Sequence, residues 1–173
     1  LERIERARQA VREQQYRDTF RQLEVTYIWG PTGVGKTRGV MERYSYSGVY
    51  RVTDYAHPFD SYAGEEVLLL DEYSSNFKIR DLLNYLDGYP LLLPCRYFNR
   101  QACFTKVFLI TNIPLEDQYR TVSEESRNAF LRRIHKVVQH GPNGPVEYDS
   151  VPAYLARDRW TDQADTAPMM EGF

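Results

Sequence analysis

The segment Gly30–Thr37 carries the strongest chemical signal in the sequence. It matches the pattern G-x-x-x-x-G-K-[ST], in which glycines let successive backbone N–H groups turn inward around phosphate oxygens. We expect Lys36 to bridge the β and γ phosphates of a nucleotide, and the hydroxyl of Thr37 to ligate Mg²⁺. The sequence therefore predicts that ATP and Mg²⁺ are bound by Gly30, Pro31, Thr32, Gly33, Val34, Gly35, Lys36 and Thr37.

Two acidic residues, Asp71 and Glu72, directly follow the apolar run Val67–Leu70. In an open parallel sheet, ligands bind beyond the carboxyl ends of the strands, where these two side chains would lie. We expect Asp71 to hold Mg²⁺ through its water shell and Glu72 to polarise the water that attacks the terminal phosphate. An ordinary strand that ends in a solvated acidic turn is the simpler alternative.

A single amide, Asn112, ends the next apolar run, Val107–Thr111. We expect Asn112 to hydrogen-bond both the terminal phosphate and the attacking water, which is the role of a sensor. Asparagine before Ile113-Pro114 is also a common turn former, so the residue type alone does not distinguish the two interpretations.

The residues around these motifs alternate between short apolar runs and helical stretches, a pattern typical of a three-layer α/β domain with a mostly parallel sheet. Strands are predicted at 25–29, 49–53, 67–70, 107–111 and 134–139, and helices at 36–44, 79–86 and 123–133. Residues 90–106 combine β-forming residues with a polar centre, which favours a hairpin.

The two ends of the chain differ from this central α/β region. Apolar residues spaced among arginines and glutamates predict an amphipathic helix or helix pair at 1–22, for oligomerisation or as a connector. Turn-forming residues from His140 to Pro145 are expected to end the alternation, and an acidic tail to pack loosely. We therefore divide the chain into a helical segment 1–24, an ATPase core 25–140 and a tail 141–173.

Length and composition limit the classes of protein to which the chain can belong. A chain of 173 residues forms one globular unit, and its net charge of −2 provides no overall basic field for nucleic acid. Apolar runs are far shorter than the roughly 20 residues that span a bilayer, so we expect no membrane insertion. Because the only cysteines are Cys95 and Cys103 and no secretory signal is visible, we expect free thiols and an intracellular protein. The start at Leu1 suggests a fragment of a longer chain.

The order of the motifs resembles that of superfamily 3 helicases, which have an AAA+-like P-loop NTPase core. The resemblance is strongest to the Rep proteins that initiate rolling-circle replication of circular single-stranded DNA viruses and related bacterial plasmids. It covers about Tyr27 to Val138, and beyond the P-loop it is carried by Leu70-Asp71-Glu72-Tyr73, Tyr89-Pro90-Leu91, Leu109-Ile110-Thr111-Asn112 and Phe130-Leu131-Arg132-Arg133-Ile134.

In that family the hairpin projects into the channel of a hexameric ring and holds DNA with basic residues, which here would be Arg96, Arg100 and Lys106. Many members carry Lys-Gly-Gly where this chain has Arg96-Tyr97-Phe98, so the gripping residue is open. Tyr97 and Phe98 could instead stack on bases. In the simpler alternative the aromatic rings pack into a core and the arginines are solvated.

The family also places an arginine finger near the end of the helix that follows the sensor strand. Arg132 or Arg133 would fill this role by reaching the nucleotide of a neighbouring subunit, and Arg127 is a third candidate. Tandem arginines at a helix end are otherwise common as complements to the helix dipole.

The resemblance implies an ATP-dependent DNA helicase that moves along single-stranded DNA, in the bacterial cytoplasm or the host-cell nucleus according to the replicon. Family members usually carry an N-terminal endonuclease domain, which is not contained in this sequence. Two other functions stay open: an NTPase that acts on RNA, because helicases of positive-strand RNA viruses share these motifs, and a protein-remodelling ATPase that binds no nucleic acid.

Overall fold

The computed structural model describes residues 1–158, and its centre is a six-stranded sheet. The strands are β1 (Glu24–Trp29), β2 (Val49–Val52), β3 (Val67–Leu70), β6 (Lys106–Thr111), β7 (Lys136–Gly141) and β8 (Gly144–Tyr148). Their order is β2-β3-β6-β1-β7-β8, and every pair is parallel except β7 with β8. The predicted α/β class with a mostly parallel sheet is confirmed.

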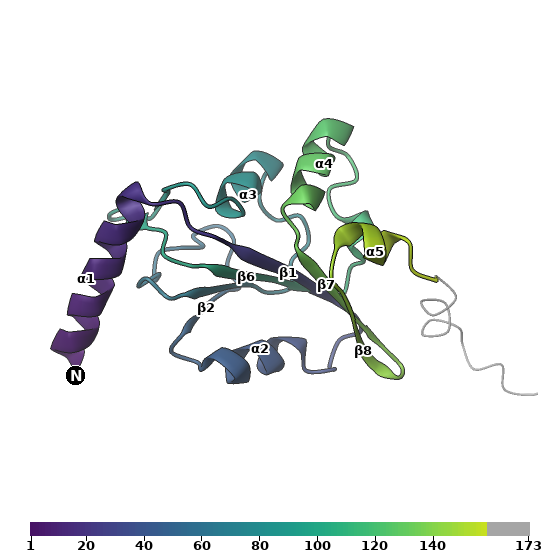
Figure 1. Ribbon diagram of the computed structural model, residues 1–173, viewed down its shortest axis with the longest axis horizontal. Helices are drawn as coiled ribbons and strands as arrows, with labels where there is room; N and C mark the ends of the chain where they lie inside the picture. Colours follow the sequence, from purple (N-terminus) through teal and green to yellow (C-terminus); the bar gives the residue numbers. More distant parts are fainter. Residues whose placement is uncertain (159–173) are drawn as a thin grey trace, which may run out of the picture.

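Helices cover both faces of the sheet (Figure 1). Helix α2 (Lys36–Tyr44) lies on one face, and α3 (Ile79–Tyr85), α4 (Glu124–Arg132) and α5 (Val151–Leu155) lie on the other. All four residues of β3 are buried, as expected for a parallel strand that is covered on both sides. A short 3₁₀ helix, Leu115–Asp117, follows the β6 strand. The sheet and its two helical layers therefore hold the strand ends in fixed positions.

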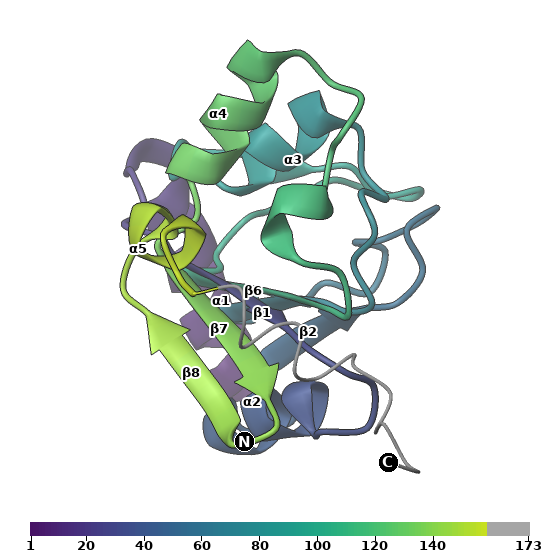
Figure 2. The same cartoon turned by 90° about the vertical axis from the view of Figure 1, so that its right-hand side faces the viewer.

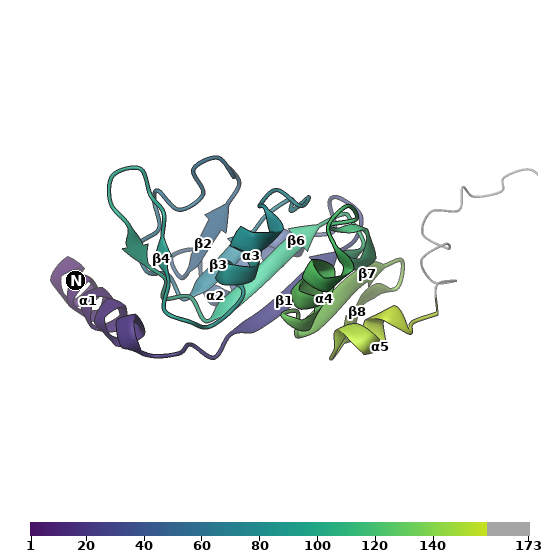
Figure 3. The same ribbon diagram turned by 90° about the horizontal axis from the view of Figure 1, so that it is seen from above.

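Helix α1 (Glu2–Asp18) and the small hairpin of β4 (Leu92–Leu93) and β5 (Arg100–Gln101) lie at the same end of the sheet (Figure 3). The side chain of Gln101 donates a hydrogen bond to the carbonyl of Tyr16 at 3.1 Å, which ties the hairpin to α1. Arg21 follows α1, is fully buried, and donates to the carbonyl of Phe104 at 2.6 Å. Both predictions, an N-terminal helix and a hairpin within 90–106, are confirmed.

The structure corrects the expectations for the last third of the chain. Strand β7 begins at Lys136 rather than at Ile134, because the Ile134 N–H still donates to the carbonyl of Leu131 in α4, at 3.2 Å. The expectation of a loosely packed tail after Gly141 is wrong for residues 144–157. Strand β8 pairs antiparallel with β7, and α5 follows it (Figure 2). Tyr154 on α5 lies edge-on against Trp29, with 6.4 Å between ring centroids. Residues 159–173 lie outside the described part of the chain, so the expected loose packing is untested there.

Both cysteines are free thiols, as expected. Burial raises the pKa of the Cys103 thiol to about 11 and also raises the pKa of Cys95. Within residues 1–158, no helix combines the length and the apolar character that crossing a bilayer requires.

Candidate active site

The loop between β1 and α2 has the backbone shape that a phosphate cradle requires. Gly33 and Gly35 have φ angles of 87° and 84°, in the left-handed region that favours glycine. Gly35 immediately precedes α2, whose first N–H groups are unpaired within the helix and carry a partial positive charge. A Cβ atom built on Gly33 or Gly35 would meet nothing within 4 Å, so the space beside the loop is open. The loop can therefore receive an anion.

The Lys36 side chain folds back over this loop. Its ammonium group donates to the carbonyls of Gly30 at 2.8 Å and Pro31 at 2.6 Å. Burial lowers the pKa of Lys36, and the negative charge of Asp71 partly offsets that effect. Lys36 is thus held at the phosphate loop, close to the carboxylate of the second motif.

Asp71 joins the loop to the second motif. Its side chain is almost fully buried at the end of β3. One carboxylate oxygen, Oδ1, accepts hydrogen bonds from the hydroxyl of Thr37 at 2.8 Å and from the backbone N–H of Glu72 at 3.0 Å. The threonine and aspartate that the sequence assigns to Mg²⁺ are therefore in direct contact.

Glu72 and Asn112 complete the same pocket, which has a volume of about 570 Å³. Strand β6 lies between β1 and β3, so Asn112 at its end lies between the phosphate loop and the two acids. Both side chains are exposed, and Glu72 has a left-handed φ of 48°, which turns the chain away from the strand. The volume falls in the range of about 300–1,000 Å³ that small-molecule sites occupy.

The predicted phosphate-binding residues do not all face this pocket. Thr32, Gly33, Gly35, Lys36 and Thr37 line it. Gly30 lies against β7, where a Cβ atom would come within 2.6 Å of the Cβ of His140, so glycine is needed there for close packing. Pro31 and Val34 lie at the exposed surface of the loop.

A magnesium ion fits the groups present at Thr37 and Asp71. Among residues 1–158, no cluster of three or more histidine, cysteine, aspartate or glutamate side chains could form a complete cage for a metal. Mg²⁺ typically binds through one or two carboxylates and takes its other ligands from substrate phosphates and water. One hydroxyl and one buried carboxylate beside a phosphate loop match that ligand set.

Two further groups contact Asp71 that the sequence did not lead us to expect. The guanidinium of Arg51, on β2, donates to Oδ2 from Nε at 2.7 Å and from Nη2 at 2.6 Å. The hydroxyl of Tyr55 donates to the backbone carbonyl of Asp71 at 2.5 Å. An arginine within the apolar strand 49–53 was the available signal. Its partner became visible only when the parallel register placed Arg51 opposite Leu69, on the face that also carries Asp71.

The arginine-finger candidates are not at this pocket. Helix α4 lies on the face of the sheet opposite α2 (Figure 1), and its last residue, Arg132, is exposed. Arg133 donates to the carbonyl of Ala129 at 2.9 Å, and Arg127 donates to the carbonyl of Glu116. The described residues that line the pocket include none of these three arginines.

The hairpin exposes the two aromatic residues that the sequence singled out. Tyr97 is 84% exposed and Phe98 is 58% exposed, so the alternative in which they pack into a core is wrong. The Arg100 guanidinium lies 4.4 Å from the centroid of the Phe98 ring. Arg96 pairs with Asp60 at 2.5 Å. Lys106 lies outside the hairpin tip, as the first residue of β6.

The hairpin and the pocket lie at opposite ends of the sheet. The hairpin precedes β6, whereas the phosphate loop follows β1, and these two strands run parallel in register. At about 3.3 Å per residue, a strand of this length separates the two sites by roughly 20 Å. Within one chain, the hairpin and the pocket are therefore not in direct contact.

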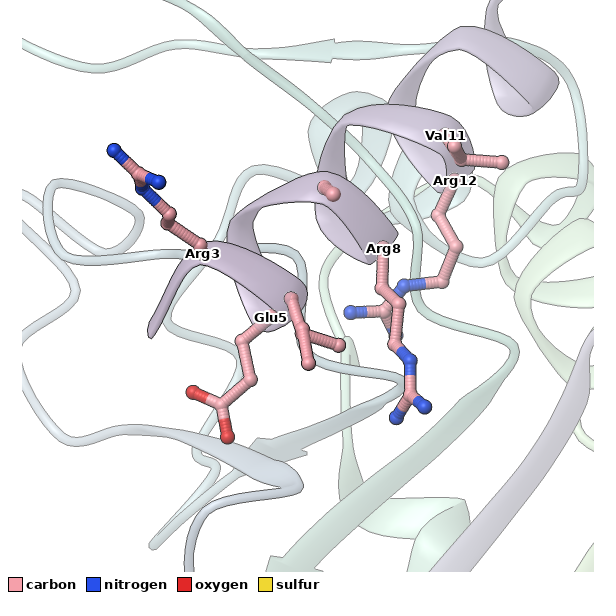
Figure 4. A pocket seen from close by; sticks show the side chains of 7 residues that line it. Arg3, Glu5, Arg8, Val11 and Arg12 are labelled. Carbon is pink, nitrogen blue, oxygen red and sulfur yellow. The ribbon is translucent and has the colours of Figure 1, made fainter. Parts of the chain in front are cut away.

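Helix α1 carries a shallow hollow of about 820 Å³. Figure 4 shows Arg3, Glu5, Arg8, Val11 and Arg12 around it. The residues that line it all belong to this one helix, so it is an exposed helix face and not an enclosed binding cavity. Ile4 and Val11 remain 56% and 66% exposed there, which leaves the expected role of α1 in oligomerisation a prediction.

Comparisons with known proteins place this chain near viral replication proteins. It is 28% identical over 97 residues to the replication-associated protein of beak and feather disease virus, a match that covers 56% of this chain and 32% of that protein. The corresponding protein of porcine circovirus 1 is 27% identical over 110 residues, 64% of this chain and 35% of that protein.

A genome polyprotein of feline calicivirus is 30% identical over 123 residues, which cover 66% of this chain and 7% of the polyprotein. No family profile matches the chain. The chain thus spans about a third of the circovirus proteins that it matches, and it is distantly similar to viral replication-associated proteins.

Proposed function

We propose that this chain is an ATP-hydrolysing motor that moves along single-stranded DNA, as part of a replication-initiator protein of the superfamily 3 helicase type. The observation that carries the proposal is the hydrogen bond between Thr37 and Asp71, which brings the phosphate loop and the acidic strand together at one pocket. The distant similarity to circovirus replication-associated proteins supports the assignment to DNA replication.

Each group in the pocket has a task in hydrolysis. The N–H groups of residues 33–37 would bind the phosphates, and Lys36 would exchange its loop carbonyls for phosphate oxygens. Glu72 would polarise the attacking water, and Asn112 would hold that water and the terminal phosphate in line. Magnesium, held by Thr37 and Asp71, would offset the charge of the phosphates.

The hairpin is the proposed contact with DNA. Tyr97 and Phe98 are exposed side by side in the sequence, and aromatic rings stack on bases without demanding a particular sequence. Arg100 adds positive charge beside the Phe98 ring. Because the whole chain has a net charge of −2, DNA binding would depend on a local site of this kind.

The assembly is part of the same proposal. In a ring of six copies, as in the helicases that the chain resembles, Arg132 or Arg133 would reach the pocket of the neighbouring subunit and stabilise charge on the transferred phosphoryl group. An endonuclease domain elsewhere in the full protein would supply the DNA nick.

Hydrolysis is tested with purified wild-type chain and two variants. Lys36→Ala should lose ATP binding, whereas Glu72→Gln should bind ATP but release phosphate at less than about one hundredth of the wild-type rate, the loss expected when a general base is removed. A Glu72→Gln protein that hydrolyses ATP at the normal rate would contradict the role of Glu72.

The motor is tested by stimulation with nucleic acid. Single-stranded DNA should raise the wild-type rate, and the double variant Tyr97→Ala, Phe98→Ala should lose this stimulation but keep the basal rate. Tyr46→Ala, which removes a 63% exposed aromatic residue after α2, is the matched control and should respond like wild type. Stimulation by RNA alone would favour the RNA-dependent NTPase, and a rate that neither nucleic acid changes would favour the protein-remodelling ATPase.

The arginine finger is tested by mixing two proteins. Mixing wild type with an Arg132→Ala, Arg133→Ala variant should lower the rate of ATP hydrolysis per wild-type subunit if the finger acts between copies.

A further inference from the structure

Arg51 is bound to the carboxylate that the proposed function reserves for magnesium. Both Nε and Nη2 of its guanidinium donate to the same oxygen, Oδ2 of Asp71, at 2.7 and 2.6 Å. The other oxygen, Oδ1, is occupied by Thr37 and by the Glu72 N–H. Arg51 therefore balances the charge of the buried carboxylate.

In this geometry, Asp71 cannot bind a magnesium ion and Arg51 at the same time. The guanidinium has only hydrogen-bond donors and cannot ligate a metal. Its positive charge would also repel a divalent cation held a few ångströms away. Metal-bound water that donates to Asp71 needs the oxygen lone pairs that Arg51 now fills. Loading of the site thus requires Arg51 to release Oδ2.

Arg51 is free to make this exchange. It lies on β2, the edge strand of the sheet, and its side chain is 48% exposed, whereas the Asp71 side chain is only 5% exposed. Arg51 lines the same pocket as Lys36 and Thr37. A long cationic side chain released from Asp71 therefore stays beside the place where the phosphates would lie, and the strongest acceptor available there is a phosphate oxygen.

We propose that Arg51 is an exchangeable cation of the nucleotide site: it pairs with Asp71 as seen here, would release Asp71 when magnesium binds there, and would then turn to the terminal phosphate of a bound triphosphate. This inference rests on the proposed function, because it requires a nucleotide in the pocket. Arg51 would thus be a second cation of this chain, besides Lys36, that favours a triphosphate over a diphosphate, independent of any arginine from a second copy.

The test compares wild type, Arg51→Gln and Arg51→Lys by calorimetric binding of a non-hydrolysable ATP analogue and of ADP, both with magnesium. Loss of one charge-assisted hydrogen bond to the terminal phosphate should reduce the ratio of ATP-analogue to ADP affinity about tenfold to a hundredfold in Arg51→Gln. Arg51→Lys, which keeps the charge but not the fork of donors, should lie between the two. Arg43→Gln removes a positive charge from α2 outside the pocket and should leave the ratio unchanged.

A second readout uses magnesium alone, without nucleotide. Magnesium chloride should raise the thermal midpoint of Arg51→Gln, in which Asp71 is uncovered, more than that of wild type at matched ionic strength. Should Arg51→Gln fail to fold, the Arg51→Lys ratio decides the question.

An arginine that only supports Asp71 gives a different pattern. Its removal would weaken the binding of both nucleotides equally and leave the affinity ratio unchanged, and this result would overturn the proposed exchange. The exchange would also be overturned if magnesium raised the thermal midpoint of wild type and of Arg51→Gln by the same amount. A wild-type chain that binds neither nucleotide would overturn the proposed function, and the role of Arg51 with it.

Discussion

Alanine substitutions at two glycines four residues apart should change the free energy of unfolding in opposite directions. Gly35 lies in the phosphate loop with φ 84° and ψ 24°, whereas Gly39 lies inside α2, where its N–H donates to the carbonyl of Gly35 at 2.9 Å. At neither position would a Cβ atom meet another heavy atom within 4 Å. The two substitutions therefore differ in backbone conformation and not in crowding.

The expected magnitudes follow from that difference. An L-residue in the left-handed region costs about 1–2 kcal/mol, so Gly35→Ala should lower the free energy of unfolding by that amount. Alanine in a helix interior is better than glycine by about 0.5–1 kcal/mol, so Gly39→Ala should raise it. For a chain of this size, 1 kcal/mol shifts the thermal midpoint by about 2–4 °C. The midpoint should fall by roughly 2–8 °C in Gly35→Ala and rise by roughly 1–4 °C in Gly39→Ala.

The assay pairs thermal unfolding, followed by circular dichroism, with calorimetric binding of ATP. Gly35→Ala should also lose at least about tenfold in affinity, because relaxing its backbone turns loop N–H groups away from the phosphates. Gly39→Ala should bind like wild type. A Gly35→Ala chain that melts at or above the wild-type midpoint, or one that binds ATP normally, would refute the reasoning.

Three further predictions concern the packing of the core, the thiols and the hairpin. Phe130 is fully buried beside Tyr119, and Phe130→Ala should lower the free energy of unfolding by about 3–5 kcal/mol, as measured in a denaturant titration. A loss below about 1 kcal/mol would show that neighbouring side chains move in to fill the cavity. Cys103 is buried and its pKa is raised to about 11, so at pH 8 it should react with a thiol reagent more slowly than the half-buried Cys95. Both thiols should react at once after unfolding. Equal reaction rates in the native chain would contradict the burial of Cys103. Hydrogen bonds from Arg96 lower the pKa of Asp60, so the contact that fixes Arg96 is present at neutral pH and lost as the pH falls through that lowered pKa. Asp60→Ala, which removes the acceptor of the Arg96 N–H, should therefore speed amide hydrogen exchange at Arg96 at neutral pH. An unchanged rate would show that Asp60 does not hold the hairpin.

Local patterns in the sequence were sufficient to predict much of the fold. Helix α2 has the predicted bounds Lys36–Tyr44, since a glycine with a left-handed φ precedes it and sets where it begins. Strand β3 has the predicted bounds Val67–Leu70, because a short apolar run that ends in two acids is typical of a buried parallel strand. Parallel pairing then brings the ends of β1, β3 and β6 together, which places Lys36, Asp71 and Asn112 around one pocket as the motif order suggested.

Features that depend on pairing partners were harder to predict. Residues 141–145 are rich in glycine and proline, which favoured a turn and an end to regular structure. The turn proved to be only Pro142-Asn143, which joins β7 to β8, and Pro145 is accepted because β8 is an edge strand. The contact between Arg51 and Asp71 joins residues 20 positions apart in the sequence and depends on the register of β2 against β3. No local pattern encodes that register.

The most direct test of the central claim is a crystal structure of the chain with magnesium and a non-hydrolysable ATP analogue. We expect the terminal phosphate to lie beside Lys36, with the metal at Thr37 and Asp71 and with the Asn112 amide in hydrogen-bond reach of a phosphate oxygen. A triphosphate bound elsewhere, or one whose terminal phosphate lies far from Asp71 and Asn112, would contradict the proposed motor.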